Sequence, residues 1–92
     1  MTCTQHRVES TKFRKDVCRA DKRCKDLCKL EQVISHIQQG TPLAARHRNH
    51  PLREGRYKDA YECHISADWL LVYRKLGNAL ILMRTGSHAD LF

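Results

Sequence analysis

The C-terminal third of the chain carries side chains suited to proton transfer and to phosphate binding. Cleavage of RNA by transesterification needs a base for the ribose 2′-OH, an acid for the leaving 5′-oxygen and a cation for the charged phosphate. Histidine suits either proton role because it titrates near neutral pH, and arginine is a forked, permanently charged phosphate ligand. His64, His88 and Arg84 supply these groups, and Trp69 and Phe92 offer rings on which a base can stack. The set predicts an RNA-cleaving site.

No metal or other cofactor is expected in this chemistry. Asp68 is the one carboxylate that we place beside the histidines, whereas a two-metal nuclease uses several clustered carboxylates. Asp68 also adjoins a predicted turn, where its side chain would cap backbone N–H groups. A zinc site on Cys24, Cys28 and a histidine is a minor alternative, because cysteines one helical turn apart do not form the tight pairs of zinc ribbons.

Length and composition limit the class of protein. The 92 residues are enough for one domain, covering 1–92, and a hydrophobic content of 41% is enough for one core. No apolar run approaches the roughly 18 residues of a membrane span, and the start MTCTQHRVES lacks the apolar stretch of a signal peptide. We therefore expect a cytoplasmic protein without membrane contact. In that reducing compartment the five cysteines (3, 18, 24, 28 and 63) are expected to be free and mostly buried.

Helical spacing dominates the first half of the chain after a short predicted strand at 3–8. Apolar residues recur at helical intervals over 10–39, with Ser10 or Thr11 as the N-cap and Gly40 at the end. One helix of that length would measure ~45 Å, which is longer than a domain of about 30–35 Å. We therefore expect a break near Asp21–Asp26 and a helical hairpin.

Strand patterns dominate the second half, after a basic loop at 41–56. Strands are predicted at 57–65, 69–76 and 79–85. Gly77-Asn78 is a good two-residue hairpin turn, and Ser66-Ala67 is a weaker one.

These two turns fix a predicted register. With Gly77-Asn78 as one turn, Leu71 faces Arg84; with Ser66-Ala67 as the other, His64 faces Trp69. These four residues then share one side of the sheet. The opposite side, facing the helices, would carry Cys63, Ile65, Leu70, Val72, Ile81 and Met83. A slip of one residue in either hairpin would scatter the set.

The positive charge is concentrated in the first half. Residues 1–56 contain 13 Lys and Arg against 6 Asp and Glu, a charge of +7, while residues 57–92 contain 4 of each kind. A basic half attracts polyanions, either nucleic acid or an acidic protein. These residues alone leave open a basic binding module without catalysis as well as an RNA-cleaving enzyme. A DNA-binding regulator is disfavoured because the helices lack helix-turn-helix spacing.

Three segments resemble the RelE superfamily of bacterial toxin–antitoxin systems, and its YafQ branch in particular. They are NHPL (49–52), YKDAYECHISADWLLVY (57–73) and RTGSHADLF (84–92). The resemblance implies an α+β fold, in which a two-helix hairpin covers one face of a small, twisted, mainly antiparallel sheet in the order β-α-α-β-β-β. It also implies an endoribonuclease toxin that cleaves mRNA in the ribosomal A site by metal-independent acid–base catalysis and inhibits translation. The alternative is a RelE-fold module without catalytic activity that binds nucleic acid or a partner.

Carried over by position, the resemblance also assigns roles. His50, His64, Asp68 and His88 would be acid–base and positioning groups, with His88 the first choice for proton transfer. Arg84 would contact the scissile phosphate, and Trp69 and Phe92 would position the mRNA. The implied partners are the 70S ribosome with its rRNA, the mRNA, and a cognate acidic antitoxin that is DinJ-like. The basic residues expected to face rRNA are Arg14, Lys15, Arg19, Lys22, Arg23, Lys25 and Lys29.

Overall fold

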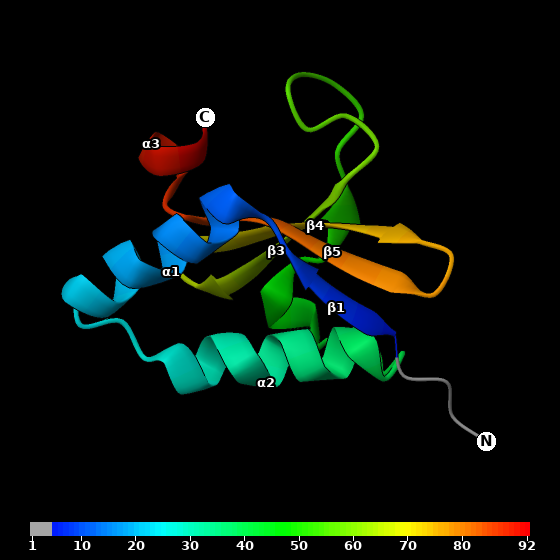
Figure 1. Ribbon diagram of the computed structural model, residues 1–92, viewed down its shortest axis with the longest axis horizontal. Coiled ribbons are helices and arrows are strands. Elements are labelled where there is room, and N and C mark those ends of the chain that lie inside the picture. The colour runs from blue at the N-terminus through cyan, green and yellow to red at the C-terminus, as the bar shows by residue number, and fades with distance from the viewer. Residues whose placement is uncertain (1–4) are drawn as a thin grey trace.

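A five-stranded sheet with a helical hairpin on one face makes up most of the molecule (Figure 1). The computed structural model describes residues 5–92. The elements are β1 (His6–Glu9), α1 (Thr11–Lys22), α2 (Leu27–Gln38), the 3-10 helix η1 (Ala45–His47), β2 (His50–Pro51), β3 (Tyr61–Ser66), β4 (Trp69–Leu76), β5 (Ala79–Gly86) and α3 (His88–Leu91).

The strands lie in the order β1-β5-β4-β3-β2. β1 runs parallel to β5, and every other neighbouring pair is antiparallel. The parallel pair is possible because β1 and β5 are far apart in the sequence, with two helices and three strands between them, and parallel strands require a long connection. The predicted fold class and element order are confirmed, with β2 and α3 as short additions. The predicted first strand at 3–8 is observed at His6–Glu9, and residues 3 and 4 lie outside the described part.

The helix ends follow local capping rules. The hydroxyl of Ser10 accepts a hydrogen bond from the backbone N–H of Phe13 at 3.0 Å, so Ser10 is the N-cap of α1. α2 ends in the αR cap Gln39, and Gly40 follows with φ +74°. This left-handed conformation costs glycine little and stops the helix. Both predicted ends are confirmed.

The predicted break between the helices is real and has no glycine. Cys24 adopts φ 60°, and the N–H of Lys25 donates to the carbonyl of Ala20 at 3.0 Å. A left-handed residue followed by this bond is a Schellman ending. Asp26 then caps α2 by accepting from the N–H of Cys28 at 3.0 Å.

The predicted register is correct from the Gly77-Asn78 turn as far as the pair Tyr73 and Leu82. It is wrong by one residue beyond that pair, and also over residues 61–64 of the β3–β4 hairpin. The β3–β4 turn is formed by 67–68, and a bulge at 65 pairs His64 with Leu70 instead of Trp69. In β5 a bulge at 83 pairs Arg84 with Val72 instead of Leu71. A bulge inserts one extra residue into one strand, so every side chain beyond it changes face.

Cys63 and Ile65 lie on the helix-facing side as predicted, whereas Leu70, Val72 and Met83, which were predicted there, lie on the opposite face. Trp69, Leu71 and Tyr73 pack toward the helices, in a core that also contains Phe13 and Ile34. The opposite face has a smaller core cluster. Leu70 and Val72 belong to it, and Met83 packs against it. Its members are Tyr57, Ala60, Leu70, Val72 and Leu91, with Leu52 and Met83 at its edge.

The expectation of mostly buried cysteines is also wrong for the described residues. Cys18, Cys24 and Cys28 are exposed free thiols, and Cys63 is buried and free. The exposed three lie on the outer surface of the helices and the turn between them, where the helical spacing leaves non-core positions. Cys3 lies outside the described part of the chain.

Candidate acid–base site

The candidate site lies on the sheet face that the helical hairpin leaves uncovered. The small core cluster beneath it includes Leu70 and Val72 from β4 and Leu91 from α3. Around this apolar base lie polar side chains from β2, β3 and the start of α3. The sheet therefore supplies a rigid support, and α3 closes one side of the site.

β2 and β3 bring two histidines to one carboxylate. His50 pairs with Glu62 across the strands, and His64 follows Glu62 by two positions and so points to the same side. Glu62 Oε1 lies 3.7 Å from His50 Nε2 and 3.9 Å from His64 Nε2. The Glu62 side chain is 7% exposed, so its charge lies in a region with little water.

The third histidine comes from α3. The ring centroids of His64 and His88 are 6.1 Å apart. Asp68 Oδ1 lies 3.6 Å from His88 Nδ1 and accepts a bond from the His88 backbone N–H at 3.4 Å. His88 also adjoins Phe92, with 6.2 Å between ring centroids. The predicted grouping of His50, His64, Asp68, His88 and Phe92 is thus present in the structure, with Glu62 added.

The tautomer of His50 follows from its hydrogen bond. Its Nδ1 lies 2.6 Å from the carbonyl oxygen of Arg48, and a carbonyl accepts but never donates. Nδ1 therefore carries a proton, and Nε2 is the ring nitrogen that faces Glu62. His47 makes a similar 2.6 Å bond to the carbonyl of His64 and connects η1 to β3.

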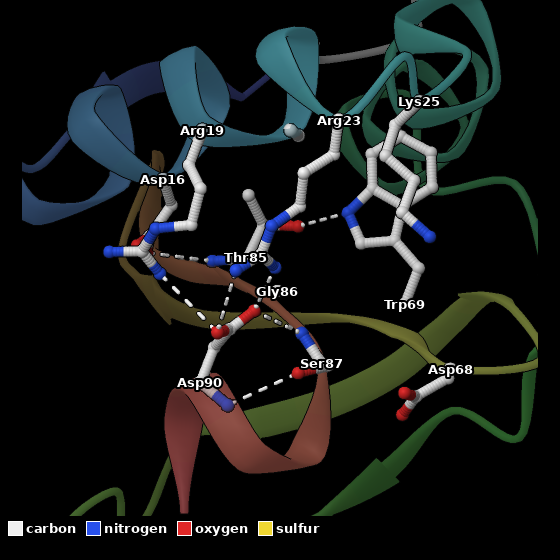
Figure 2. Close-up of a pocket in the computed structure, with 11 residues that line it drawn as sticks. Asp16, Arg19, Arg23, Lys25, Asp68, Trp69, Thr85, Gly86, Ser87 and Asp90 are labelled. Atoms are coloured by element: carbon white, nitrogen blue, oxygen red, sulfur yellow. Dashed lines mark hydrogen bonds and ion pairs between the residues drawn. The ribbon is translucent and has the colours of Figure 1, made fainter.

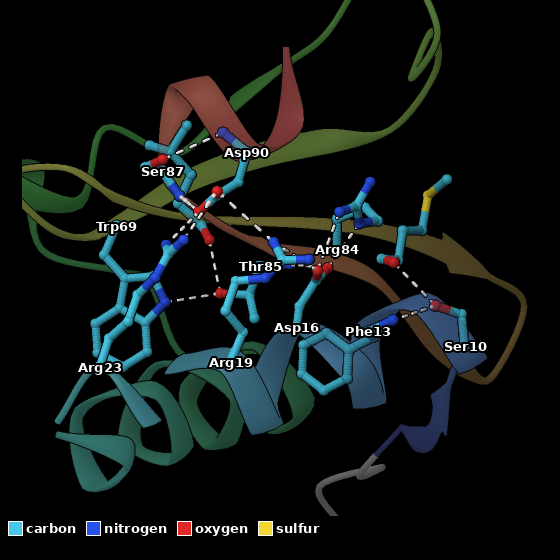
Figure 3. A network of polar contacts seen from close by, with 12 residues as sticks. Ser10, Phe13, Asp16, Arg19, Arg23, Trp69, Arg84, Thr85, Ser87 and Asp90 are labelled. Carbon is cyan, nitrogen blue, oxygen red and sulfur yellow. Dashed lines mark hydrogen bonds and ion pairs between the residues drawn. The ribbon is translucent and has the colours of Figure 1, made fainter. Parts of the chain in front are cut away.

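Arg84 is held by a buried carboxylate (Figure 3). Its Nε and Nη2 donate to the two oxygens of Asp16 at 2.6 and 3.0 Å, and its Nη1 donates to the hydroxyl of Tyr57 at 3.2 Å. The bonds to Asp16 raise the pKa of Arg84 above its usual value. The predicted phosphate ligand is therefore fixed in place by α1, and Nη1 is the part of its fork on the side of Tyr57.

Tyr57 connects Arg84 with the end of the chain. Its ring packs edge-on against Phe92, with 5.6 Å between centroids. Phe92 is 61% exposed. Tyr57 thus contacts both an exposed ring and a fixed guanidinium, an arrangement suited to stacking a base while the arginine contacts a phosphate.

Trp69 does not lie in this site. It is 2% exposed, on the helix-facing side of the sheet, and its indole N–H donates to the hydroxyl of Thr85 at 2.9 Å (Figure 2). The predicted shared face with His64 is wrong, for the reason of register given above. A buried ring has no surface for stacking on RNA, so we assign Trp69 to the core.

The basic residues predicted to face rRNA are exposed. Those of α1 and the following turn lie away from the core positions Phe13, Asp16 and Ala20. Arg23 also forms an ion pair with Asp90 of α3, with Nη1 2.8 Å from Oδ2. The exposed basic residues are Arg14, Lys15, Arg19, Lys22, Arg23, Lys25 and Lys29.

Sequence reasoning missed three residues of the site region. Glu62 could have been found from strand alternation, since it lies two positions before His64. Asp16 has a helical signal, because it occupies a core position next to Phe13 where a charged residue needs a partner. Tyr57 was assigned to a strand but lies in the preceding turn, and no simple pattern places its hydroxyl beside Arg84.

Among residues 5–92, no group of three or more His, Cys, Asp and Glu side chains is arranged to hold a metal ion. In the same part of the chain, no helix is both long and apolar enough to span a bilayer.

Residues 5–92 match the family model described as the bacterial toxin of type II toxin–antitoxin system, YafQ. The chain belongs to this family. Its members include the mRNA interferase toxin YafQ of Escherichia coli strain K12, which is 39% identical over 84 residues, or 90% of each chain. The predicted family is confirmed, and with it the predicted class of enzyme, since the curated relative is named an mRNA interferase.

Solved structures of similar proteins share the fold. The Escherichia coli DinJ–YafQ toxin–antitoxin complex contains a chain that matches with a TM-score of 0.87 and 36% identity, over 97% of this chain and 98% of that one. A metal-bound toxin from Helicobacter pylori matches with a TM-score of 0.88 and 40% identity, over 96% of this chain and 99% of that one. This chain and these two toxins therefore share one α+β architecture.

Proposed function

We propose that this toxin is a ribosome-dependent mRNA interferase that cleaves mRNA in the ribosomal A site by metal-independent general acid–base catalysis. The observation that carries the proposal is the cluster of His50, His64 and His88 with the carboxylates Glu62 and Asp68 on the uncovered sheet face. Membership of the YafQ family supports the same activity.

The chemistry assigns one proton transfer to each side of the scissile phosphate. A base takes the proton of the ribose 2′-OH, the 2′-oxygen attacks phosphorus, and an acid protonates the departing 5′-oxygen. The products are a 2′,3′-cyclic phosphate and a 5′-hydroxyl end. His64 and His88, with ring centroids 6.1 Å apart, are close enough to act on one phosphodiester. His88, 59% exposed, is our first choice for direct contact with RNA.

Arg84 is the proposed ligand for the charged phosphate. Its guanidinium stays protonated, and the two bonds to Asp16 fix its orientation before substrate arrives. Donors held in advance stabilise developing charge without a cost of reorganisation in the transition state. Phe92, exposed beside Tyr57, is proposed to hold the mRNA by stacking.

Two partners follow from charge and family. We propose that the exposed basic residues of α1 and α2 dock on rRNA, since such contacts depend on net positive charge. An acidic, DinJ-like antitoxin is proposed to bind the toxin, because the Escherichia coli relative was solved in complex with DinJ.

The test is mRNA cleavage on programmed 70S ribosomes by wild type, His88→Ala and His36→Ala. His36 is a matched control, an exposed histidine of α2 without a proposed role. We expect His88→Ala to cleave roughly 10²–10⁴-fold more slowly with unchanged ribosome binding, and His36→Ala to cleave like wild type. Equal rates for all three proteins would remove His88 from the chemistry. Ribosome binding by wild type without cleavage would favour the non-catalytic binding module instead.

A further inference from the structure

The helix that presents His88 is too short to be stable by itself. α3 spans His88–Leu91, and a helix of one turn has no stability in water without tertiary contacts. Leu91 is buried against the small core cluster, which fixes one side of the helix. The orientation of the His88 ring therefore depends on whatever holds the other side.

Asp90 supplies that second attachment. Its carboxylate accepts bonds from Arg23 at 2.8 and 3.4 Å and lies 3.7 Å from Arg19 Nη1 (Figure 2). It also accepts from the backbone N–H of Ser87 at 3.0 Å, while the Ser87 hydroxyl accepts from the N–H of Asp90 at 3.2 Å. Asp90 thus completes a capping box inside α3 and joins α3 to the end of α1.

The space around Asp90 is also fitted to it. A Cβ atom placed on Gly86 would lie 3.0 Å from both Cβ and Oδ2 of Asp90. Glycine at this position lets the carboxylate lie directly on the last residue of β5. The Asp90 side chain is 15% exposed, although Arg23 is half exposed. Hydrogen bonds from Arg23 lower the pKa of Asp90 well below its usual range, so the ion pair persists at neutral pH.

We propose that Asp90 and Arg23 are positioning residues, which hold α3 against α1 and thereby fix His88 for proton transfer. The proposal rests on the proposed acid–base function of His88. Arg23 then has a second role besides the predicted contact with rRNA. Substituting Arg23 should slow catalysis by displacing α3 and weaken ribosome binding by removing a positive charge.

Two substitutions separate these tasks. Asp90→Asn keeps an oxygen that can accept from Ser87 but loses the charged partner of Arg23, whereas Arg23→Ala removes the same ion pair together with one basic charge. We expect each variant to lower the cleavage rate on saturating ribosomes about tenfold, because small displacements of a catalytic group are costly. Arg23→Ala alone should also weaken ribosome binding. Arg23→Lys should restore part of the rate.

Two further measurements complete the test, the energetic coupling between Asp90 and Arg23 and the amide exchange of α3. In the double variant Asp90→Asn/Arg23→Ala the rate should fall no further than in the single variants, because both remove one interaction. The amides of Leu91 and Phe92, which bond to the carbonyls of Ser87 and His88, should exchange faster while the melting temperature stays nearly constant. Lys75→Ala, which removes an exposed charge at the far end of β4, is the control and should leave rate and exchange unchanged.

Three results would overturn the proposal. The first is a wild-type cleavage rate in Asp90→Asn, and the second is an additive loss in the double variant. The third is unchanged amide exchange in α3 in both single variants. If wild-type protein does not cleave mRNA at all, the proposed function fails, and amide exchange still decides whether the ion pair holds α3.

Discussion

The two faces of the sheet are built from the same strands but serve different ends. Toward α1 and α2 the strands present a dry core in which Trp69, Leu71 and Tyr73 are almost fully buried. On the other face the residues next to them in sequence, such as Leu70 and Val72, form a small apolar base for a group of histidines and carboxylates. The comparison shows how strand alternation separates stability from chemistry within a few residues.

Arg84 joins the two faces, so its removal is expected to lower both stability and cleavage. Arg84→Ala leaves the buried carboxylate of Asp16 without its bidentate partner, which should cost about 3–5 kcal/mol of unfolding free energy. Cleavage by the folded fraction should fall roughly 10²–10³-fold through loss of the phosphate ligand. Denaturant unfolding and single-turnover cleavage measure the two losses separately.

A second substitution keeps this prediction testable if the variant unfolds. Arg84→Ala/Asp16→Asn should recover part of the stability, because the unpaired charge is removed, without recovering cleavage. Recovery of cleavage together with stability would show that Arg84 has a structural role alone.

Two aromatic residues test the difference between the faces, because Trp69 is 2% exposed and Phe92 is 61% exposed. Trp69→Leu should lower the unfolding free energy by about 3 kcal/mol through lost packing and the lost bond to Thr85. Cleavage per folded molecule should stay close to wild type. Phe92→Leu should show the reverse, with unchanged stability and weaker mRNA binding by about 1–3 kcal/mol for a lost stacked base. A cleavage defect in folded Trp69→Leu would contradict its assignment to the core.

Thiol labelling tests the burial of the helix-facing core with the least change to the protein. Burial raises the pKa of Cys63 to about 12, so this thiol stays protonated and unreactive on the helix-facing side. Cys18, Cys24 and Cys28 are exposed and should react within the first phase of labelling of native protein. Cys63 should react only after denaturant is added. Labelling of Cys63 at the rate of the exposed thiols would show that the core opens readily.

Local sequence signals predicted the helices, strands and turns but not the register between the strands. The N-cap at Ser10, the helix stop at Gly40 and the turn at Gly77-Asn78 are short-range features, and each was predicted correctly. The bulges at 65 and 83 carry no glycine or other marker, and each shifts the register by one residue. The left-handed Cys24 between the helices is equally unmarked. Strand register depends on side-chain packing between segments that are far apart in the sequence, and a local sequence pattern does not contain this information.

The family resemblance predicted which residues lie together in the candidate site better than the predicted strand register did. The predicted pairing of His64 with Trp69 failed, yet His50, His64, Asp68 and His88 do meet, as the resemblance implied. The sequence does carry a local signal for α3, the Ser-x-x-Asp pattern of a capping box at Ser87 and Asp90. Asp16 could be flagged as a buried charge, but its distant partner Arg84 could not be read from spacing.

The most direct test of the division between the faces compares two neighbours on β3. Cys63 is buried toward the helices and His64 faces the proposed site. We predict that His64→Gln keeps the fold and loses mRNA cleavage on 70S ribosomes by roughly 10²–10⁴-fold, because glutamine cannot transfer a proton. Cys63→Ala should melt earlier and still cleave like wild type while folded. Wild-type cleavage by His64→Gln, or loss of cleavage in folded Cys63→Ala, would contradict the placement of the chemistry on the uncovered face.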